Sequence, residues 1–169
     1  MVNKNIVLCG FMGSGKSVVG KALAQRLNIE FIDMDAFIEK EQNMSVNEIF
    51  ENKGEECFRK FETEAAISLG NFNDKVISCG GGTVINPKNV MALKQNGKIF
   101  YLSVTPETVI KRLENANDRP LLAKDKENTI FALLKNRSPI YEAASDYTVD
   151  SNKSVDHTVE QILKIIKEA

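Results

Sequence analysis

The chain has 169 residues, of which 43 % are hydrophobic and 27 % are charged, and this predicts one globular domain over residues 1–169. The net charge of −1, with acidic and basic residues interleaved, argues against a nucleic-acid partner, and the lack of any run of about 18 apolar residues argues against a membrane one. We expect no signal peptide, and three cysteines without C-x-x-C spacing are typical of reduced thiols in a cytoplasmic protein.

The first predicted element is a strand that leads into a glycine-rich loop. Residues 7–9 form an apolar run, and residues 10–17 fit G-x-x-x-x-G-K-[ST], the phosphate-binding pattern. From Lys16 onward, apolar residues recur at helical spacing. Backbone N–H groups can converge on a phosphate in such a loop, where the helix N-terminus adds positive partial charge. We therefore predict a nucleotide site formed by Gly10, Met12, Gly13, Ser14, Gly15, Lys16, Ser17 and Val18, with the Ser17 hydroxyl also on Mg²⁺.

The stretch after this helix predicts a helical insertion of about residues 35–69. Residues 30–35 read as a strand that ends in Asp33 and Asp35, and Asp35 is expected to cap the following helix. Ser45 and Glu48 form a capping box that opens a short helix, and Gly54 is expected to end it. A longer amphipathic helix follows. Three helical segments between two strands are more than a simple crossover needs.

The second half of the chain predicts further strand–helix units. Residues 76–79 read as a strand that runs into three glycines, and Asn86 is expected to cap a helix that buries Val90, Met91 and Leu93. A polar loop over residues 114–126 has no apolar face and is interpreted as a lid. The remaining expected elements are strands at 98–103 and 146–150 and helices at 105–113, 128–144 and 155–169.

This alternation of strands and helices predicts a three-layer α/β fold with a five-stranded parallel sheet. A nucleotide-binding loop, an inserted helical segment and a polar loop together suggest a small kinase with an acceptor pocket. Nothing in the sequence indicates a repeat or a linker, and the small size favours a monomer.

The sequence resembles the shikimate kinases, P-loop enzymes similar to nucleoside-monophosphate kinases, over nearly its whole length. The resemblance implies ATP-dependent phosphorylation of the 3-hydroxyl of shikimate, in aromatic amino-acid biosynthesis, on a sheet of order 2-3-1-4-5. Its six motifs follow in chain order: Gly10-Phe-Met-Gly-Ser-Gly-Lys-Ser17, Asp33-Met-Asp35, Phe58-Arg59-Lys-Phe-Glu62, Gly80-Gly81-Gly82, Arg119-Pro-Leu-Leu and Arg137-Ser-Pro-Ile-Tyr141.

Two carboxylates are the candidates for the reaction centre. Phosphoryl transfer needs positioning, Mg²⁺ and positive charge more than covalent help. Asp33, near the loop, is expected to bind Mg²⁺, directly or through water, with helix capping as the alternative. Asp35 is expected to orient the acceptor hydroxyl or to take its proton. Lys16, Asp35 and Arg119 are the catalytic candidates.

The acceptor side is expected to consist of two arginines and the glycine triplet. Arg59 and Arg137 are candidates for a bidentate clamp on a carboxylate, and Glu62, one helical turn after Arg59, is expected to hold that side chain, with a surface ion pair as the alternative. Gly80, Gly81 and Gly82 are expected to bring backbone N–H groups close to the substrate, unless they form a plain turn.

The resemblance adds two arginines on the nucleotide side. Arg119 is expected to close over the ATP phosphates, and Arg112 is expected to stack on adenine. The residues 150–154 depart from relatives that carry a proline against the other face of the base, so the adenine pocket is the least defined part of the prediction.

Three alternatives remain at this stage. A gluconate or nucleotide kinase on the same fold would also use arginines. A regulatory GTPase is disfavoured because Asn-Lys-x-Asp is missing: the sequences after Asn52 and Asn152 both fail at the last position. A nucleotide-binding module without catalysis is disfavoured by the presence of Lys16, Asp35 and Arg119.

Overall fold

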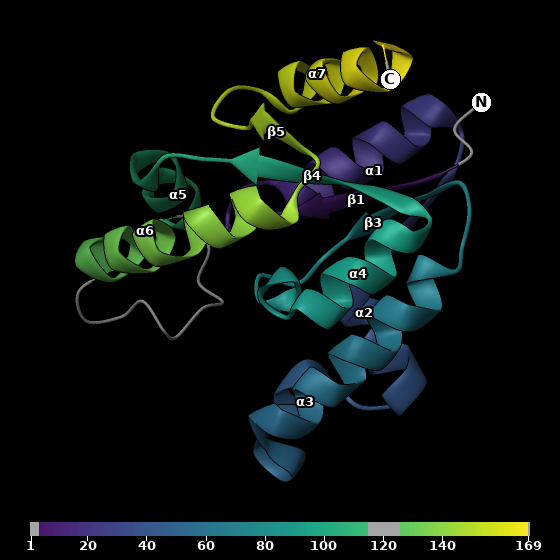
Figure 1. The fold of residues 1–169 in the computed structure, drawn as a ribbon. Helices are drawn as coiled ribbons and strands as arrows, with labels where there is room; N and C mark the ends of the chain where they lie inside the picture. The colour runs from purple at the N-terminus through teal and green to yellow at the C-terminus, as the bar shows by residue number, and fades with distance from the viewer. Residues whose placement is uncertain (1–3, 115–125, 169) are drawn as a thin grey trace.

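The computed structural model describes residues 4–114 and 126–168, and their strands form one parallel sheet (Figure 1). The order is β2-β3-β1-β4-β5, with Val7 of the central strand paired to Ile77 on one side and Ile99 on the other. This confirms the predicted fold class and strand order. The strands are β1 (Asn5–Cys9), β2 (Glu30–Asp33), β3 (Lys75–Ser78), β4 (Gly97–Ser103) and β5 (Tyr147–Asp150).

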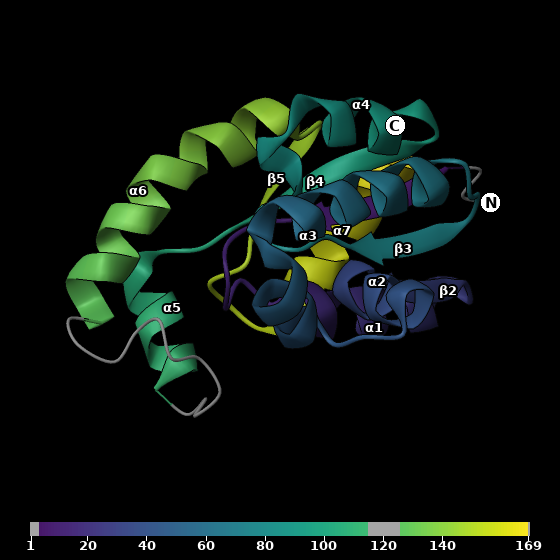
Figure 2. The same ribbon diagram turned by 90° about the horizontal axis from the view of Figure 1, so that it is seen from below.

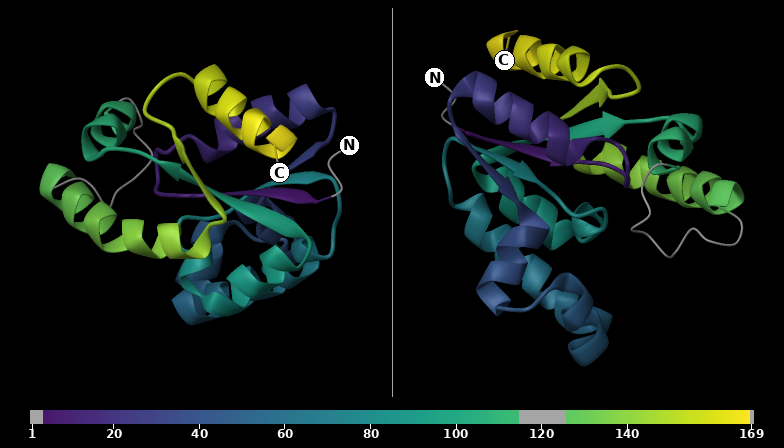
Figure 3. Two further views of the ribbon diagram at one scale, coloured as in Figure 1. Left: turned by 45° about the horizontal axis from the view of Figure 1, so that its top comes forward. Right: turned by 180° about the vertical axis from the view of Figure 1, so that it is seen from behind.

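Helices cover both faces of the sheet, as Figures 2 and 3 show from below and from two further sides. Helices α1 and α7 lie together on one face, and α2, α3 and α4 lie on the other. The bounds are α1 (Lys16–Leu27), α2 (Met34–Gln42), α3 (Val46–Gly70), the 3₁₀ turn η1 (Thr83–Ile85), α4 (Pro87–Gln95), α5 (Pro106–Leu113), α6 (Lys126–Ala144) and α7 (Val155–Glu168).

Alternate residues of the central strands build two separate cores. Val7 and Ile99 pack with residues from α2, α3, α4 and α6, whereas Leu8 and Phe100 pack with residues from α1 and α7. Side chains alternate between the faces of a strand, so strands that are apolar at every position bury both faces. The three layers therefore follow from the continuous apolar runs in the sequence.

The predicted helix starts around the insertion are confirmed at one site and corrected at another. Ser45 and Glu48 form both bonds of a capping box, and Gly54 breaks the regular backbone of α3 with φ 80° and ψ 169°. The expected cap at Asp35 is wrong. Asp33 is the cap, because β2 ends there in register with Ser78 of β3, and its side chain accepts a hydrogen bond from the Ala36 N–H.

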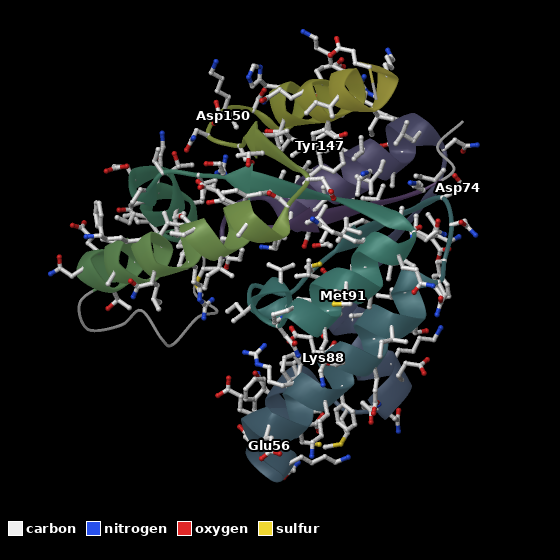
Figure 4. The ribbon with its side chains drawn as sticks, in the orientation of Figure 1. Glu56, Asp74, Lys88, Met91, Tyr147 and Asp150 are labelled. Atoms are coloured by element: carbon white, nitrogen blue, oxygen red, sulfur yellow. The ribbon has the colours of Figure 1, made fainter. Side chains whose placement is uncertain are left out.

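The expected burial of Met91 is also wrong. Its side chain is 75 % exposed on α4, and Figure 4 labels it. Asn89 takes the buried position instead, since its amide donates to the Thr83 carbonyl oxygen at 2.9 Å. Asn89 and Leu93 are four residues apart and share the inner face, so Met91 between them turns outward.

No helix within residues 4–114 and 126–168 is long and apolar enough to cross a membrane. Arg119 and nearly all of the predicted lid lie outside the described residues.

Candidate active site

A cavity of about 640 Å³ opens where β1, β2 and β3 end, and most of the predicted site residues line it. Parallel sheets of this kind bind ligands at the carboxyl ends of their strands. The predicted residues in its wall are Met12, Gly13, Gly15, Lys16, Ser17, Val18, Asp33, Asp35, Arg59, Gly80, Gly81, Gly82 and Arg137. Further lining residues are Val46, Asn47, Phe50, Phe58, Glu62, Ser78 and Cys79.

The phosphate-binding loop joins β1 to α1 in a conformation that requires glycine. Gly10 has φ 145°, and a Cβ built there would lie 2.9 Å from the Leu102 carbonyl oxygen. Lys16 begins α1, and its ammonium group donates to the carbonyl oxygens of Gly10 and Phe11 at 2.8 and 2.9 Å. The side chain thus spans the loop that it follows in sequence, with its positive charge in the cavity wall.

Three predicted nucleotide-binding residues do not line the cavity: Gly10, Ser14 and Arg112. Arg112 donates to the carbonyl oxygens of Gly13 at 3.0 Å and Ser151 at 2.6 Å, and the Ser151 hydroxyl donates to the Ser14 carbonyl oxygen at 2.6 Å. The segment after β5 is therefore tied to the loop. Stacking of Arg112 on adenine stays a prediction.

Ser17 and Asp33 face each other at the cavity wall. The Ser17 hydroxyl donates to Oδ2 of Asp33 at 3.3 Å, while Oδ1 of the same carboxylate caps α2. Both expected roles of Asp33 are thus compatible, because each uses a different oxygen. No cluster of three or more His, Cys, Asp or Glu side chains suited to a metal occurs in the described part of the chain. A hydroxyl and a carboxylate are hard oxygen donors, which fits a divalent ion that also keeps water and phosphate ligands.

Asp35 lies in the first turn of α2 with its carboxyl group largely buried. Its pKa is raised from an ordinary 3.8 to about 6, mainly because the group is buried. The negative charges of Asp33 and Glu62 contribute to the rise, and the positive charge of Lys16 opposes it. A carboxylate with a pKa near neutrality can accept a proton or orient a hydroxyl.

Arg59 is fixed by two carboxylates on its own helix. Glu55 accepts from Nη2 at 3.2 Å and Glu62 accepts from Nη1 at 3.0 Å. Glu62 is only 2 % exposed, and its other oxygen accepts from the Thr83 hydroxyl at 2.8 Å. The expectation that Glu62 holds Arg59 is confirmed. Because Glu62 is buried, this is no surface ion pair.

Arg137 reaches the same cavity from α6. Its Nη1 atom would be the nearest neighbour of a Cβ on Gly81, at 3.8 Å. In contrast to Arg59, Arg137 forms no ion pair with a carboxylate among residues 4–114 and 126–168. Its charge is thus available for an anionic ligand, while that of Arg59 is shared.

A family model described as shikimate kinase matches residues 12–167 of this chain. The chain belongs to the shikimate kinase family. A shikimate kinase of Caldanaerobacter subterraneus subsp. tengcongensis is 47 % identical over 163 residues, which cover 95 % of each chain. A shikimate kinase of Geobacter sulfurreducens is 42 % identical over 167 residues, covering 98 % of this chain and 92 % of the relative.

Solved structures agree with this family assignment. A shikimate kinase from Acinetobacter baumannii, in complex with shikimate, superposes with a TM-score of 0.89 at 35 % identity, over 98 % of this chain and 94 % of that one. A gluconokinase from Sinorhizobium meliloti 1021 superposes with a TM-score of 0.63 at 17 % identity, over 99 % and 93 % of the two chains. The second likeness shows the fold alone.

The sequence suggests Phe50 and Phe58 as apolar walls of the pocket or as core residues, and Ser78 as a contact of the metal's water shell; all three line the cavity. Sequence reasoning missed three other residues of the cavity wall in this shikimate-kinase-like site. Cys79 directly precedes the glycine triplet, so its place could have been inferred from theirs. Val46 and Asn47 follow the capping box at the start of α3, and no local pattern indicates that this helix start faces the cavity.

Proposed function

We infer that this protein transfers the γ-phosphoryl group of ATP to the 3-hydroxyl of shikimate, giving shikimate 3-phosphate and ADP. It is a small-molecule kinase of aromatic amino-acid and chorismate biosynthesis. The observation that carries this conclusion is the meeting of a phosphate-binding loop, Asp35 and two arginines in one cavity. In the reaction, the hydroxyl oxygen bonds to the γ-phosphorus, the bond to the β–γ bridging oxygen breaks, and the hydroxyl proton leaves.

We propose that the loop and its helix hold the nucleotide. Lys16 would bring positive charge to the β- and γ-phosphates, and backbone N–H groups from Met12 to Val18 would bind their oxygens. Ser17 and Asp33 would hold a divalent ion, which we take to be Mg²⁺ on the basis of their hard oxygens. When bound, this ion neutralises charge on the phosphates.

On the acceptor side, Arg59 and Arg137 would bind the shikimate carboxylate, and their planar guanidinium groups suit bidentate pairing. Asp35 would orient the 3-hydroxyl and receive its proton. The glycine triplet, Gly80, Gly81 and Gly82, lies between Asp35 and the two arginines and would bind the ring hydroxyls through its backbone.

The proposal extends to the organisation of the chain. Residues 35–69 would form the substrate-binding part of a single domain over residues 1–169. Residues 114–126, with Arg119, would close over ATP, a prediction that concerns residues outside the described ones. All three cysteines are free thiols, which supports the expected cytoplasmic location. We also propose that the protein acts as a monomer, with no nucleic-acid or membrane partner.

A coupled assay of ADP release with Mg·ATP tests the proposal. Shikimate should support turnover, while gluconate and nucleoside monophosphates should not. Lys16→Ala should lower kcat by at least about 100-fold, because preorganised positive charge acts mainly in the transition state. Turnover with gluconate or a nucleotide but not with shikimate would contradict the assignment.

A further inference from the structure

Tyr141 lies immediately behind the acceptor side of the cavity and has no assigned role. Its side chain is fully buried, and its hydroxyl donates a hydrogen bond to the Gly81 carbonyl oxygen at 2.7 Å. The two residues are 60 positions apart in the sequence, so this bond joins α6 to the loop after β3. Tyr141 is not part of the cavity wall, whereas Gly81 is.

The same hydroxyl lies beside Arg137. Arg137 and Tyr141 are four positions apart on α6, so both project from one face of the helix. A Cβ on Gly81 would have Arg137 Nη1 at 3.8 Å and the Tyr141 hydroxyl at 4.0 Å as its neighbours. The phenol, the guanidinium group and the glycine backbone therefore meet at one point, at Gly81 of the cavity wall.

The tyrosine itself is held rigidly and stays protonated. Its ring packs against that of Tyr101 with centroids 5.4 Å apart. Burial raises the pKa of Tyr141 to about 12, although the nearby Arg137 charge opposes the shift. The hydroxyl is therefore a donor at every pH at which the enzyme would be assayed.

We propose that Tyr141 is a positioning residue for the acceptor, which fixes the Gly81 backbone and the Arg137 guanidinium group relative to each other without touching the substrate. Arginine has a long flexible side chain, and bidentate binding of a carboxylate depends on its orientation. Arg59 is oriented by Glu55 and Glu62. Tyr141 performs the corresponding task for Arg137. This inference rests on the proposed function.

Tyr141→Phe tests the proposal, with Tyr101→Phe as the matched control. Tyr101 is also buried and its ring packs against that of Tyr141, but its hydroxyl donates to the Ser138 hydroxyl at 3.3 Å, away from the cavity wall. We expect Tyr141→Phe to raise the KM for shikimate by about 3- to 10-fold, the factor carried by one neutral hydrogen bond, with the KM for ATP changed less than about 2-fold. Tyr101→Phe should leave both KM values unchanged. Equal effects of the two variants on the KM for shikimate would overturn the proposal.

A double-mutant cycle tests the link to Arg137. In an Arg137→Lys background, Tyr141→Phe should raise the KM for shikimate by a smaller factor than in the unaltered protein, because part of its effect passes through the guanidinium group. The same factor in both backgrounds would overturn the link. Failure of the proposed function would look different, because the unaltered protein would then not phosphorylate shikimate at all.

Discussion

Gly82 and Arg59 come so close that there is no room for a side chain between them. A Cβ built on Gly82 would lie 2.7 Å from Nη1 of Arg59 and 3.1 Å from its Cζ. The guanidinium group cannot simply swing aside, because Glu55 and Glu62 hold it at 3.2 and 3.0 Å. The close approach of Arg59 thus leaves no space for a side chain on the third glycine of the triplet.

Gly82→Ala should therefore raise the KM for shikimate by about 10-fold or more, because the added methyl group displaces Arg59, one arm of the proposed carboxylate clamp. Gly82 has φ −103°, which alanine adopts readily, so the thermal midpoint should change little. Gly81→Ala is the matched comparison, since its nearest neighbour would lie at 3.8 Å. A smaller KM change for Gly82→Ala than for Gly81→Ala would contradict this reading. Steady-state kinetics at saturating ATP measures both variants.

The pH profile of kcat/KM for shikimate should report the carboxyl group of Asp35. Its pKa of about 6 predicts that kcat/KM falls about tenfold per pH unit below pH 6, as the proposed proton acceptor becomes protonated. The charge of Glu62 contributes to the raised pKa, so Glu62→Gln should move the inflection to lower pH. Glu55→Gln removes the other partner of Arg59. It should leave the inflection at the same pH, although it can change the value of kcat/KM on the plateau. An inflection that Glu62→Gln does not move would contradict the assignment to Asp35.

Asp35→Asn should stabilise the protein at neutral pH while it lowers kcat by about 10²- to 10⁴-fold. The raised pKa means that the folded state keeps a proton between about pH 4 and 6 that the unfolded chain releases. Stability therefore falls as pH rises through this window, and above pH 6 the folded protein bears the full cost of a buried, ionised carboxylate. Because Asp35→Asn removes the buried charge, it should increase the free energy of unfolding by up to about 3 kcal/mol at pH 8 and by almost nothing at pH 4.

Urea denaturation of Asp35→Asn at the two pH values measures this difference. Asp74→Asn is the control, because Asp74 lies in an exposed turn before β3 and is labelled in Figure 4. Asp74→Asn also removes one negative charge, but this charge is exposed to solvent. An equal gain in both variants would mean that net charge, and not the environment of Asp35, is responsible.

Local signals account for most of what the sequence predicts correctly. The phosphate-binding loop is contiguous, the capping box at Ser45 involves neighbours, and Arg59 and Glu62 share a helix face by spacing alone. Asp33 replaces Asp35 as the cap because pairing with Ser78 of β3 sets the end of β2, and that partner is remote in sequence. Asn89 displaces Met91 from the buried face for a similar reason, since the Thr83 carbonyl that it satisfies is supplied by the fold.

Residues that act through distant backbone atoms could not be found in this way. Tyr141 and Gly81 are 60 residues apart, and Ser151 and Ser14 are 137 residues apart. Nothing in the order of the residues near Ser151 indicates that its hydroxyl turns toward the first loop of the chain. Such contacts exist only once the strands have taken their places in the sheet.

Ser151 is expected to control the affinity for ATP. Its side chain is buried, and its hydroxyl donates to the Ser14 carbonyl oxygen at 2.6 Å, within the phosphate-binding loop. Ser151→Ala removes this bond, which is worth about 0.5–1.5 kcal/mol, and should raise the KM for ATP by about 3- to 10-fold with the KM for shikimate unchanged. Thr158→Val is the control, because this buried hydroxyl donates to the Asp150 carbonyl oxygen of the same segment and not to the loop. Both variants should lose some thermal stability, but only Ser151→Ala should weaken the binding of ATP. An unchanged KM for ATP in Ser151→Ala would show that the bond stabilises the fold without shaping the nucleotide site.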